Sequence, residues 1–159
     1  MEHSALAGYS ILVVEEEPFI AHCLKVLLED AGVDVHGATS AADALHISDR
    51  KTLTAGVLAC SKGTKGCRRV AQRLARLDVP FVICMDAGQL EEWPGVPVLI
   101  KPVRGFQVLE TLGQLINAKA ERLRIAAESL CSTEKNLQLA GAHTLRPSTN
   151  TKEIPHGKS

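Results

Sequence analysis

Three consecutive carboxylates and one lysine–proline pair are the residues of this 159-residue chain whose types and order could support chemistry. Glu15, Glu16 and Glu17 directly follow an apolar run rich in β-branched residues. Clustered carboxylates suit a hard cation such as Mg²⁺, which takes oxygen ligands. Lys101 and Pro102 follow a second apolar run, so the lysine ammonium could reach the same pocket. The bond before Pro102 is a candidate for a cis peptide in a tight turn.

Strand-like and helix-like segments alternate along the chain, and these elements must position the charged residues. Apolar, β-branched runs predict strands, and apolar residues at helical spacing predict the helices between them. Five such alternations predict an α/β domain with a five-stranded parallel sheet and helices on both faces. The expected strands are 9–14, 33–38, 55–60, 80–85 and 96–100. The first expected helix begins at Pro18 and is closed by Gly32, and the second spans 41–47. The third carries Val70, Leu74 and Leu77, and the last spans 105–120.

The segment between the fourth and fifth expected strands is too short for a regular helix. Residues 86–95 contain Pro94 and two glycines, so at most one weak helical turn fits there. In parallel sheets, functional sites form outside the C-terminal ends of the strands. That rule directs attention to residues 15–17, 59–62, 85–86 and 101.

Composition and charge exclude several classes of protein. Hydrophobic residues make up 45% of the chain, enough to bury a core, and 18 basic residues balance 18 acidic ones. A general nucleic-acid binder would show a basic excess, and a platform for single strands needs more than the 3% of aromatic residues present. The longest strongly apolar run, residues 79–85, is too short to span a membrane. We therefore expect no membrane association and no specific nucleic-acid partner.

Cysteine usage predicts a reducing compartment. The five cysteines are odd in number and lack C-x-x-C spacing, so we interpret them as reduced and mostly buried thiols. A redox pair of Cys60 and Cys84 on adjacent strands is the alternative. The first residues show no basic region leading into an apolar stretch, which argues against a secretory signal. Together these features predict a cytoplasmic protein.

The composition changes near residue 118. Residues 119–159 carry a net charge of +3, so the first 118 residues carry −3. Residues 121–140 have helix-forming character and are expected to form a helical extension that dimerises or docks a partner. Residues 141–159 are rich in Ser, Thr, Pro and Lys and are expected to be disordered. The predicted folded domain spans residues 8–120.

Two motifs resemble those of bacterial two-component response-regulator receiver domains. Residues 11–18 (ILVVEEEP) are similar to the opening of such a domain, and residues 98–102 (VLIKP) are similar to its end. Five β-α units connect the motifs, so the resemblance covers about residues 8–120. It implies a flavodoxin-like (CheY-like) fold with a shortened fourth helix, in a protein of two-component signalling.

The resemblance also implies roles for three charged positions. Glu15 and Glu16 fall on the acidic pair that holds Mg²⁺ in this family. Lys101 falls on the lysine that contacts the phosphoryl group of the phosphorylated domain. These three residues keep the charges of the family's pocket.

Three other positions depart from the family's pattern. Ala59 falls on the phosphoacceptor aspartate, Met85 on a Ser or Thr that relays phosphorylation, and Val98 on a switching aromatic residue. Alanine has no nucleophile, so aspartyl phosphorylation at position 59 is chemically excluded. Residues 52–66 contain no Asp or Glu that could replace it. Binding of Mg²⁺ is expected to be weak at best, because the missing aspartate at position 59 would be one of its ligands. Asp86 is a candidate substitute for that carboxylate. No other cofactor is expected.

These observations favour a stand-alone, degenerate receiver that signals by binding a partner without phosphotransfer and is not an enzyme. The resemblance implies a signalling partner: a histidine kinase, a response regulator, another two-component protein or a second copy of the chain. One alternative is an active receiver in which Ser61 or Thr64 takes the phosphoryl group. Another is a small enzyme on a flavodoxin-like fold that uses Glu15, Glu16 and Lys101, although no nucleophile–base pair is evident.

The expected binding surface is the face around residues 86–102 and the last helix, which the family uses for partners and dimers. Trp93, Pro102 and Phe106 belong to it. Trp93 is the only tryptophan and could be an exposed anchor for a partner. The alternative is a ring packed over Pro94 and the last helix.

Overall fold

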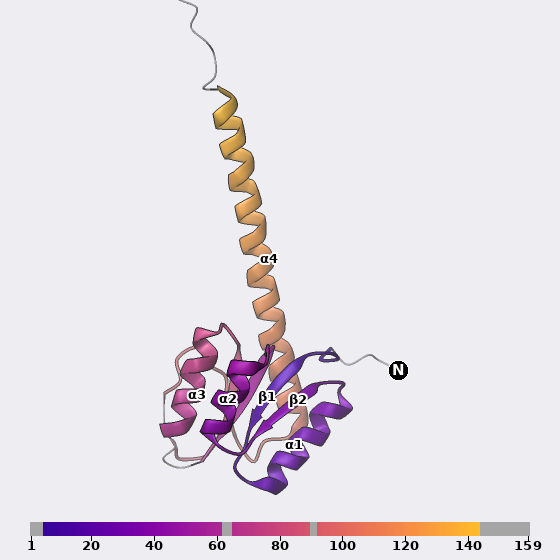
Figure 1. The fold of residues 1–159 in the computed structure, drawn as a ribbon. Coiled ribbons are helices and arrows are strands. Elements are labelled where there is room, and N and C mark those ends of the chain that lie inside the picture. Colours follow the sequence, from indigo (N-terminus) through magenta and orange to yellow (C-terminus); the bar gives the residue numbers. More distant parts are fainter. Residues whose placement is uncertain (1–4, 62–64, 90–91, 144–159) are drawn as a thin grey trace, which may run out of the picture. The chain divides into compact units, whose positions relative to one another are not determined.

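A computed structural model describes residues 5–61, 65–89 and 92–143 of the chain. The chain divides into two compact units, residues 1–120 and residues 121–159. The first unit is an α/β domain, and the second contains the C-terminal part of the last helix (Figure 1). Each unit is described by itself below.

The first unit is built on a five-stranded, entirely parallel sheet in the order β2-β1-β3-β4-β5. The strand order changes direction at β1, which pairs with both β2 and β3. Every residue of β3 is buried, as expected for a central strand covered on both faces. The predicted parallel sheet is confirmed. The strands are β1 (Ser10–Val14), β2 (Asp34–Ala38), β3 (Ala55–Cys60), β4 (Phe81–Asp86) and β5 (Val98–Lys101).

Four helices follow from local sequence signals and cover the sheet: α1 (Pro18–Asp30), α2 (Ala41–Arg50), α3 (Lys65–Arg76) and α4 (Gly105–His143). Glu17 caps the N-terminus of α1, where Pro18 fits the first turn, and Ser40 caps α2 by accepting the N–H of Asp43. Gly32, at φ +81°, takes the left-handed conformation that lets the chain leave α1. The third helix ends before Leu77, which is 42% exposed.

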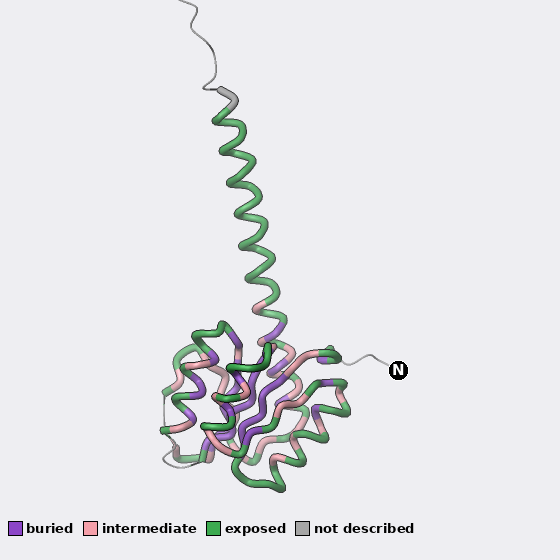
Figure 2. Tube along the Cα trace, viewed as in Figure 1, coloured by how far each residue is buried: buried purple, intermediate pink, exposed green. Residues whose placement is uncertain are grey.

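Alternate residues of each strand point to opposite faces and form two hydrophobic clusters, buried purple in Figure 2. Cluster 1 lies under α2 and α3 and contains Leu12, Leu58, Ile83 and Met85 with helix residues such as Val70 and Leu74. Cluster 2 lies under α1 and α4 and contains Ile11, Val57, Ala59, Val82 and Cys84 with helix residues such as Leu28, Val108 and Leu112. The two clusters are the core of the first unit.

The connection from β4 to β5 contains turns and no helix among its described residues, 87–89 and 92–97. Gly88 and Gly95 adopt positive φ values of +94° and +72°, conformations that side-chain-bearing residues avoid. Pro94 further prevents a regular helix. The expectation of a shortened fourth helix is therefore met by its replacement with turns.

The second unit, as far as it is described, is one helical segment. Helix α4 continues without interruption to His143, through the expected helical extension at residues 121–140. Residues 121–141 are all exposed, and Arg124 bridges Glu121 and Glu128 along the helix. The expected disordered tail comprises residues 141–159. Its first three residues belong to α4, and residues 144–159 lie outside the described residues. No helix of the described residues is long and apolar enough to cross a membrane.

The cysteines depart from the expectation that all five are reduced, whereas three of them are buried, in line with the expectation that most would be. Cys60 and Cys67 form a disulfide, with their Cα atoms 6.0 Å apart. The fold produces this pairing because the end of β3 and the first turn of α3 place the two residues within the usual span of a disulfide. Cys84 is a buried free thiol, whereas Cys23 and Cys131 are exposed.

Candidate functional site

The three consecutive glutamates do not act as one cluster, because each is directed to a different partner. Glu15 is 5% exposed, and its Oε1 accepts the backbone N–H of Glu17 at 2.9 Å. The exposed Glu16 accepts a hydrogen bond from the Ser61 hydroxyl at 3.3 Å. Glu17 is used as the cap of α1. Only Glu15 therefore contributes a buried carboxylate to the site.

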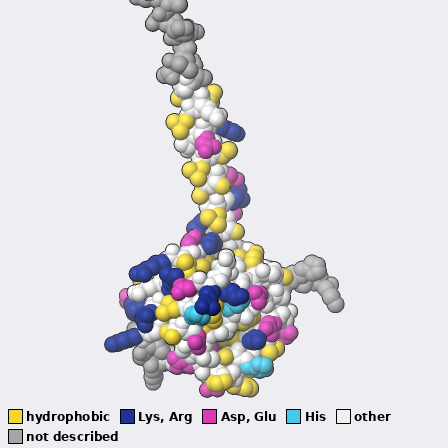
Figure 3. All heavy atoms as spheres, viewed as in Figure 1, with side chains coloured by type: hydrophobic (Ala, Val, Ile, Leu, Met, Phe, Trp, Pro, Cys, Tyr) yellow, Lys and Arg dark blue, Asp and Glu magenta, His cyan; other side chains and the backbone are white. Residues whose placement is uncertain are grey.

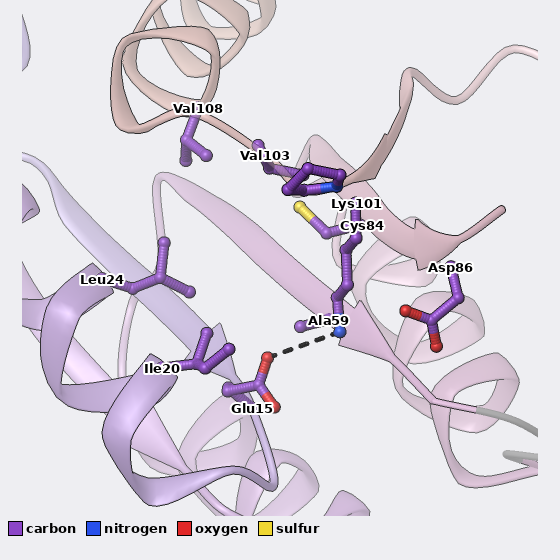
Figure 4. A pocket seen from close by; sticks show the side chains of 10 residues that line it. Glu15, Ile20, Leu24, Ala59, Cys84, Asp86, Lys101, Val103 and Val108 are labelled. Atoms are coloured by element: carbon purple, nitrogen blue, oxygen red, sulfur yellow. Dashed lines mark ion pairs between the residues drawn. The ribbon is translucent and has the colours of Figure 1, made fainter.

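Strand β5 positions the lysine of the site. Lys101 is the last residue of β5, and its bond to Pro102 is cis. Its Nζ lies 3.8 Å from Oε2 of Glu15, and its side chain is 25% exposed (Figure 4). The two residues come from β5 and the end of β1, which β3 and β4 separate in the sheet. The ion pair thus spans the carboxyl ends of the two intervening strands, β3 and β4.

Ala59 lies beside this ion pair and is 7% exposed (Figure 4). It pairs with Cys84 across the β3–β4 ladder, and both side chains belong to cluster 2. Together with the ion pair they line a pocket of about 460 Å³. The remaining lining residues are mostly apolar and come from α1, α4 and the end of β5, with one further carboxylate at the end of β4: Ile20, Leu24, Val108, Val103, Pro102 and Asp86.

The structure does not bring all the sequence-derived candidates together. Met85 is buried in cluster 1, on the sheet face opposite to Ala59, and Val98 packs against the same cluster. Alternation along β4 explains this placement, because Cys84 and Asp86 point to the pocket side while Met85 points away. Glu16 also lies outside the pocket lining, on its contact with Ser61.

The proposed partner-face residues are distributed over two sides of the first unit. Trp93 is half-buried against cluster 1, with the Arg68 guanidinium carbon 5.3 Å from the ring centroid. Its ring thus packs on the face covered by α2 and α3, where the arginine stacks on it. Phe106 is 59% exposed in the first turn of α4, the helix that covers the other face. Pro102 lines the pocket instead.

Burial raises the pKa of the Cys84 thiol to about 11, an increase that Lys101 opposes and Glu15 reinforces. Desolvation disfavours the charged thiolate, so the neutral thiol dominates near neutral pH. Sequence reasoning missed Cys84 as a pocket residue. The signal that could have found it is the two-residue period of β4, which places Cys84 on the same face as Asp86.

Alkylation should separate Cys84 from the other free cysteines. At pH 8 its thiolate fraction is expected to be roughly a hundredfold below that of an ordinary thiol, so iodoacetamide should modify Cys23 and Cys131 first. The difference should shrink as the pH rises toward 11, since the Cys84 thiol then ionises as well. Peptide mass spectrometry over a pH series measures this order. Modification of Cys84 at pH 8 as fast as Cys23 would contradict it.

The residues at the site fit Mg²⁺ poorly. Among the described residues, no group of three His, Cys, Asp or Glu side chains could hold a metal ion. The Glu15 carboxylate is engaged by the Glu17 amide and Lys101, and Glu16 contacts Ser61. Mg²⁺ requires near-octahedral oxygen coordination, which this arrangement does not offer.

Comparisons with solved structures give the fold a family context. A response regulator receiver protein from Sinorhizobium medicae is 24% identical, with a TM-score of 0.60, covering 69% of this chain and 95% of that one. A CheY-like receiver domain from Methanospirillum hungatei is 17% identical, with a TM-score of 0.65 and coverage of 72% and 98%. The receiver domain of a sensor histidine kinase from Pseudomonas aeruginosa is 20% identical, with a TM-score of 0.61 and coverage of 70% and 99%.

The chain matches no protein-family model and no curated protein sequence. The similarity in structure nevertheless covers nearly the whole length of each of these three receiver domains. The fold of this chain is that of the response-regulator receiver domains, the CheY-like form of the flavodoxin-like fold. The resemblance inferred from the two sequence motifs is thereby confirmed at the level of the fold.

Proposed function

We propose that this protein is a receiver-like signalling protein that acts by binding a partner without accepting a phosphoryl group. The observation that carries the proposal is Ala59 at the end of β3, beside the Glu15–Lys101 ion pair. A phosphoryl acceptor needs a nucleophilic atom, and a methyl group has none. The similarity in fold supports the signalling context, since the similar structures include a response regulator receiver protein and the receiver domain of a sensor histidine kinase.

The neighbouring groups support the same proposal. Lys101 is already paired with a carboxylate from its own chain. Met85, at the position of the relaying hydroxyl, is buried in the opposite cluster and carries no hydroxyl. No nucleophile–base pair lines the pocket, whose nucleophilic group is a Cys84 thiol held neutral by burial. A binding role thus needs fewer assumptions than an enzymatic one.

Phosphoryl transfer gives the direct test of this function. After incubation with Mg²⁺ and radiolabelled acetyl phosphate, the full-length protein should carry no acid-stable or acid-labile label. An active receiver domain treated in parallel is the positive control. Stoichiometric label on any side chain, including a hydroxyl such as that of Ser61, would overturn the proposal in favour of an active receiver.

The second unit supports a second copy of the chain as one partner. Leu123, Leu130 and Leu137 recur every seven residues on one side of α4 and are 58%, 68% and 67% exposed. Figure 3 shows hydrophobic side chains along this exposed segment. These leucines occupy one of the two apolar positions of a coiled-coil heptad, and helices in proteins owe most of their stability to the packing of an apolar face. The Arg124 guanidinium pairs with Glu121 and Glu128 of the same helix, so none of these ion pairs involves the three leucines.

Self-association should therefore depend on this leucine stripe. Light scattering coupled to size exclusion is expected to show a dimer for the full-length chain and a monomer for Leu130→Asp, because a charge in the seam is costly to bury. Gln138→Asp, on another side of the same helix, is the matched control and should remain dimeric. A monomeric full-length protein at ~100 µM would contradict self-association through this helix.

A further inference from the structure

The pocket above Ala59 has an apolar wall and one buried carboxylate oxygen without a hydrogen bond. Ile20, Leu24 and Val108 form much of the wall, and Figure 4 shows their side chains directed toward the same space as Glu15. At about 460 Å³ the pocket is within the roughly 300–1,000 Å³ typical of sites for small organic molecules. Its size depends on Ala59, since a larger side chain there would occupy the space.

The unsatisfied atom is Oε2 of Glu15. The Glu15 side chain is 6% exposed, and Oε2 is buried with no hydrogen-bond partner, although Oε1 accepts the Glu17 amide. The nearest cation, Nζ of Lys101, is 3.8 Å away, which is too far for a hydrogen bond. A buried carboxylate oxygen that accepts no hydrogen bond costs free energy, so a donor supplied by a ligand would be favourable.

The charges around the pocket specify the donor. Glu15 and Asp86 contribute two carboxylates and Lys101 one ammonium, so the lining carries a net charge of −1 when all three are ionised. A cation is favoured over an anion in such a site. Cys84, which is neutral because of its burial, adds a polarisable apolar surface to the floor.

We propose that this pocket binds a small primary amine with a short apolar chain. The ammonium donates a hydrogen bond to Oε2 of Glu15, and the apolar chain lies against Ile20, Leu24 and Val108. This inference goes beyond the proposed function, because amine binding does not require that the protein lack phosphotransfer or bind a partner. It assigns a ligand to the space that Ala59 leaves at the end of β3.

Calorimetric titration of the full-length protein with n-hexylamine tests the proposal. Saturable binding of the amine is expected, with n-hexanol and hexanoate binding at least about tenfold more weakly. Hexanol has the same chain without the charge, and hexanoate has the opposite charge. Absence of saturable amine binding up to ~10 mM, or equal binding of hexanoate, would overturn the proposal.

Variants locate the binding site. Glu15→Gln and Ala59→Leu should each weaken amine binding at least about tenfold, the first by removing the charge and the second by filling the pocket. Ala127→Leu, on the exposed part of α4, is the matched control and should bind like the wild type. Ile20→Ser, at a partly exposed position of the apolar wall, should also weaken amine binding and replaces Ala59→Leu as the test if that variant does not fold. Unchanged affinity in Glu15→Gln would contradict the assignment.

Discussion

Replacing Lys101 by methionine is expected to lower the free energy of unfolding by about 2–4 kcal/mol. The substitution keeps an unbranched side chain but leaves the buried Glu15 carboxylate without its counter-charge. Removing one member of a buried ion pair is costly because the other charge remains desolvated. The lower part of this range applies if water reaches the site, since the Lys101 side chain is 25% exposed. Urea-induced unfolding followed by circular dichroism measures the change.

Two further variants separate the ion pair from general effects of the substitution. Adding Glu15→Gln to Lys101→Met should recover most of the lost stability, because the uncompensated charge is then gone. Lys25→Met breaks an exposed pair with Glu29 on α1 and should change stability by less than about 0.5 kcal/mol. A loss in Lys101→Met no larger than that in Lys25→Met would show that the buried pair contributes little.

Replacing Ala59 by aspartate is expected to destabilise the protein by about 2–4 kcal/mol when divalent cations are absent. The site is 7% exposed, and a new carboxylate there would lie close to Glu15 and share the pocket with Asp86. The introduced carboxylate also supplies the oxygen ligand that the present site lacks. Millimolar Mg²⁺ should therefore raise the melting temperature of Ala59→Asp and leave that of the wild type unchanged.

Ala59→Asn is the control for shape, because the amide has nearly the volume of the carboxylate without its charge. It should be destabilised less and should show no response to Mg²⁺. Differential scanning fluorimetry with and without the cation measures all three proteins. An equal Mg²⁺-dependent increase in the wild type would mean that Glu15 and Glu16 bind the cation without a third carboxylate.

Most of the first unit could be predicted from local sequence patterns. The bounds of β3 match the expected 55–60, and the other strands differ from expectation by at most two residues at either end. Short apolar runs between helical repeats are strong signals, because a buried parallel strand must be apolar on both faces. The caps at Glu17 and Ser40 fix the starts of α1 and α2 in the same local way.

Other features depend on contacts that no local pattern contains. The triplet at 15–17 predicts one acidic cluster, yet Glu16 is drawn to Ser61 and Glu17 to the helix cap. Cys60 and Cys67 form a disulfide although their spacing matches no common motif.

The sequence by itself determined the alternation of strands and helices, the charged residues at the strand ends and the alanine where a nucleophile would be needed. These follow from residue type and short-range spacing. Only the tertiary structure decided that Glu15 alone turns inward to Lys101 and that Ala59, Cys84 and the apolar residues of α1 and α4 enclose a pocket around them. The physical reason is that side-chain direction, burial and the pairing of a buried charge depend on neighbours that are distant in the chain.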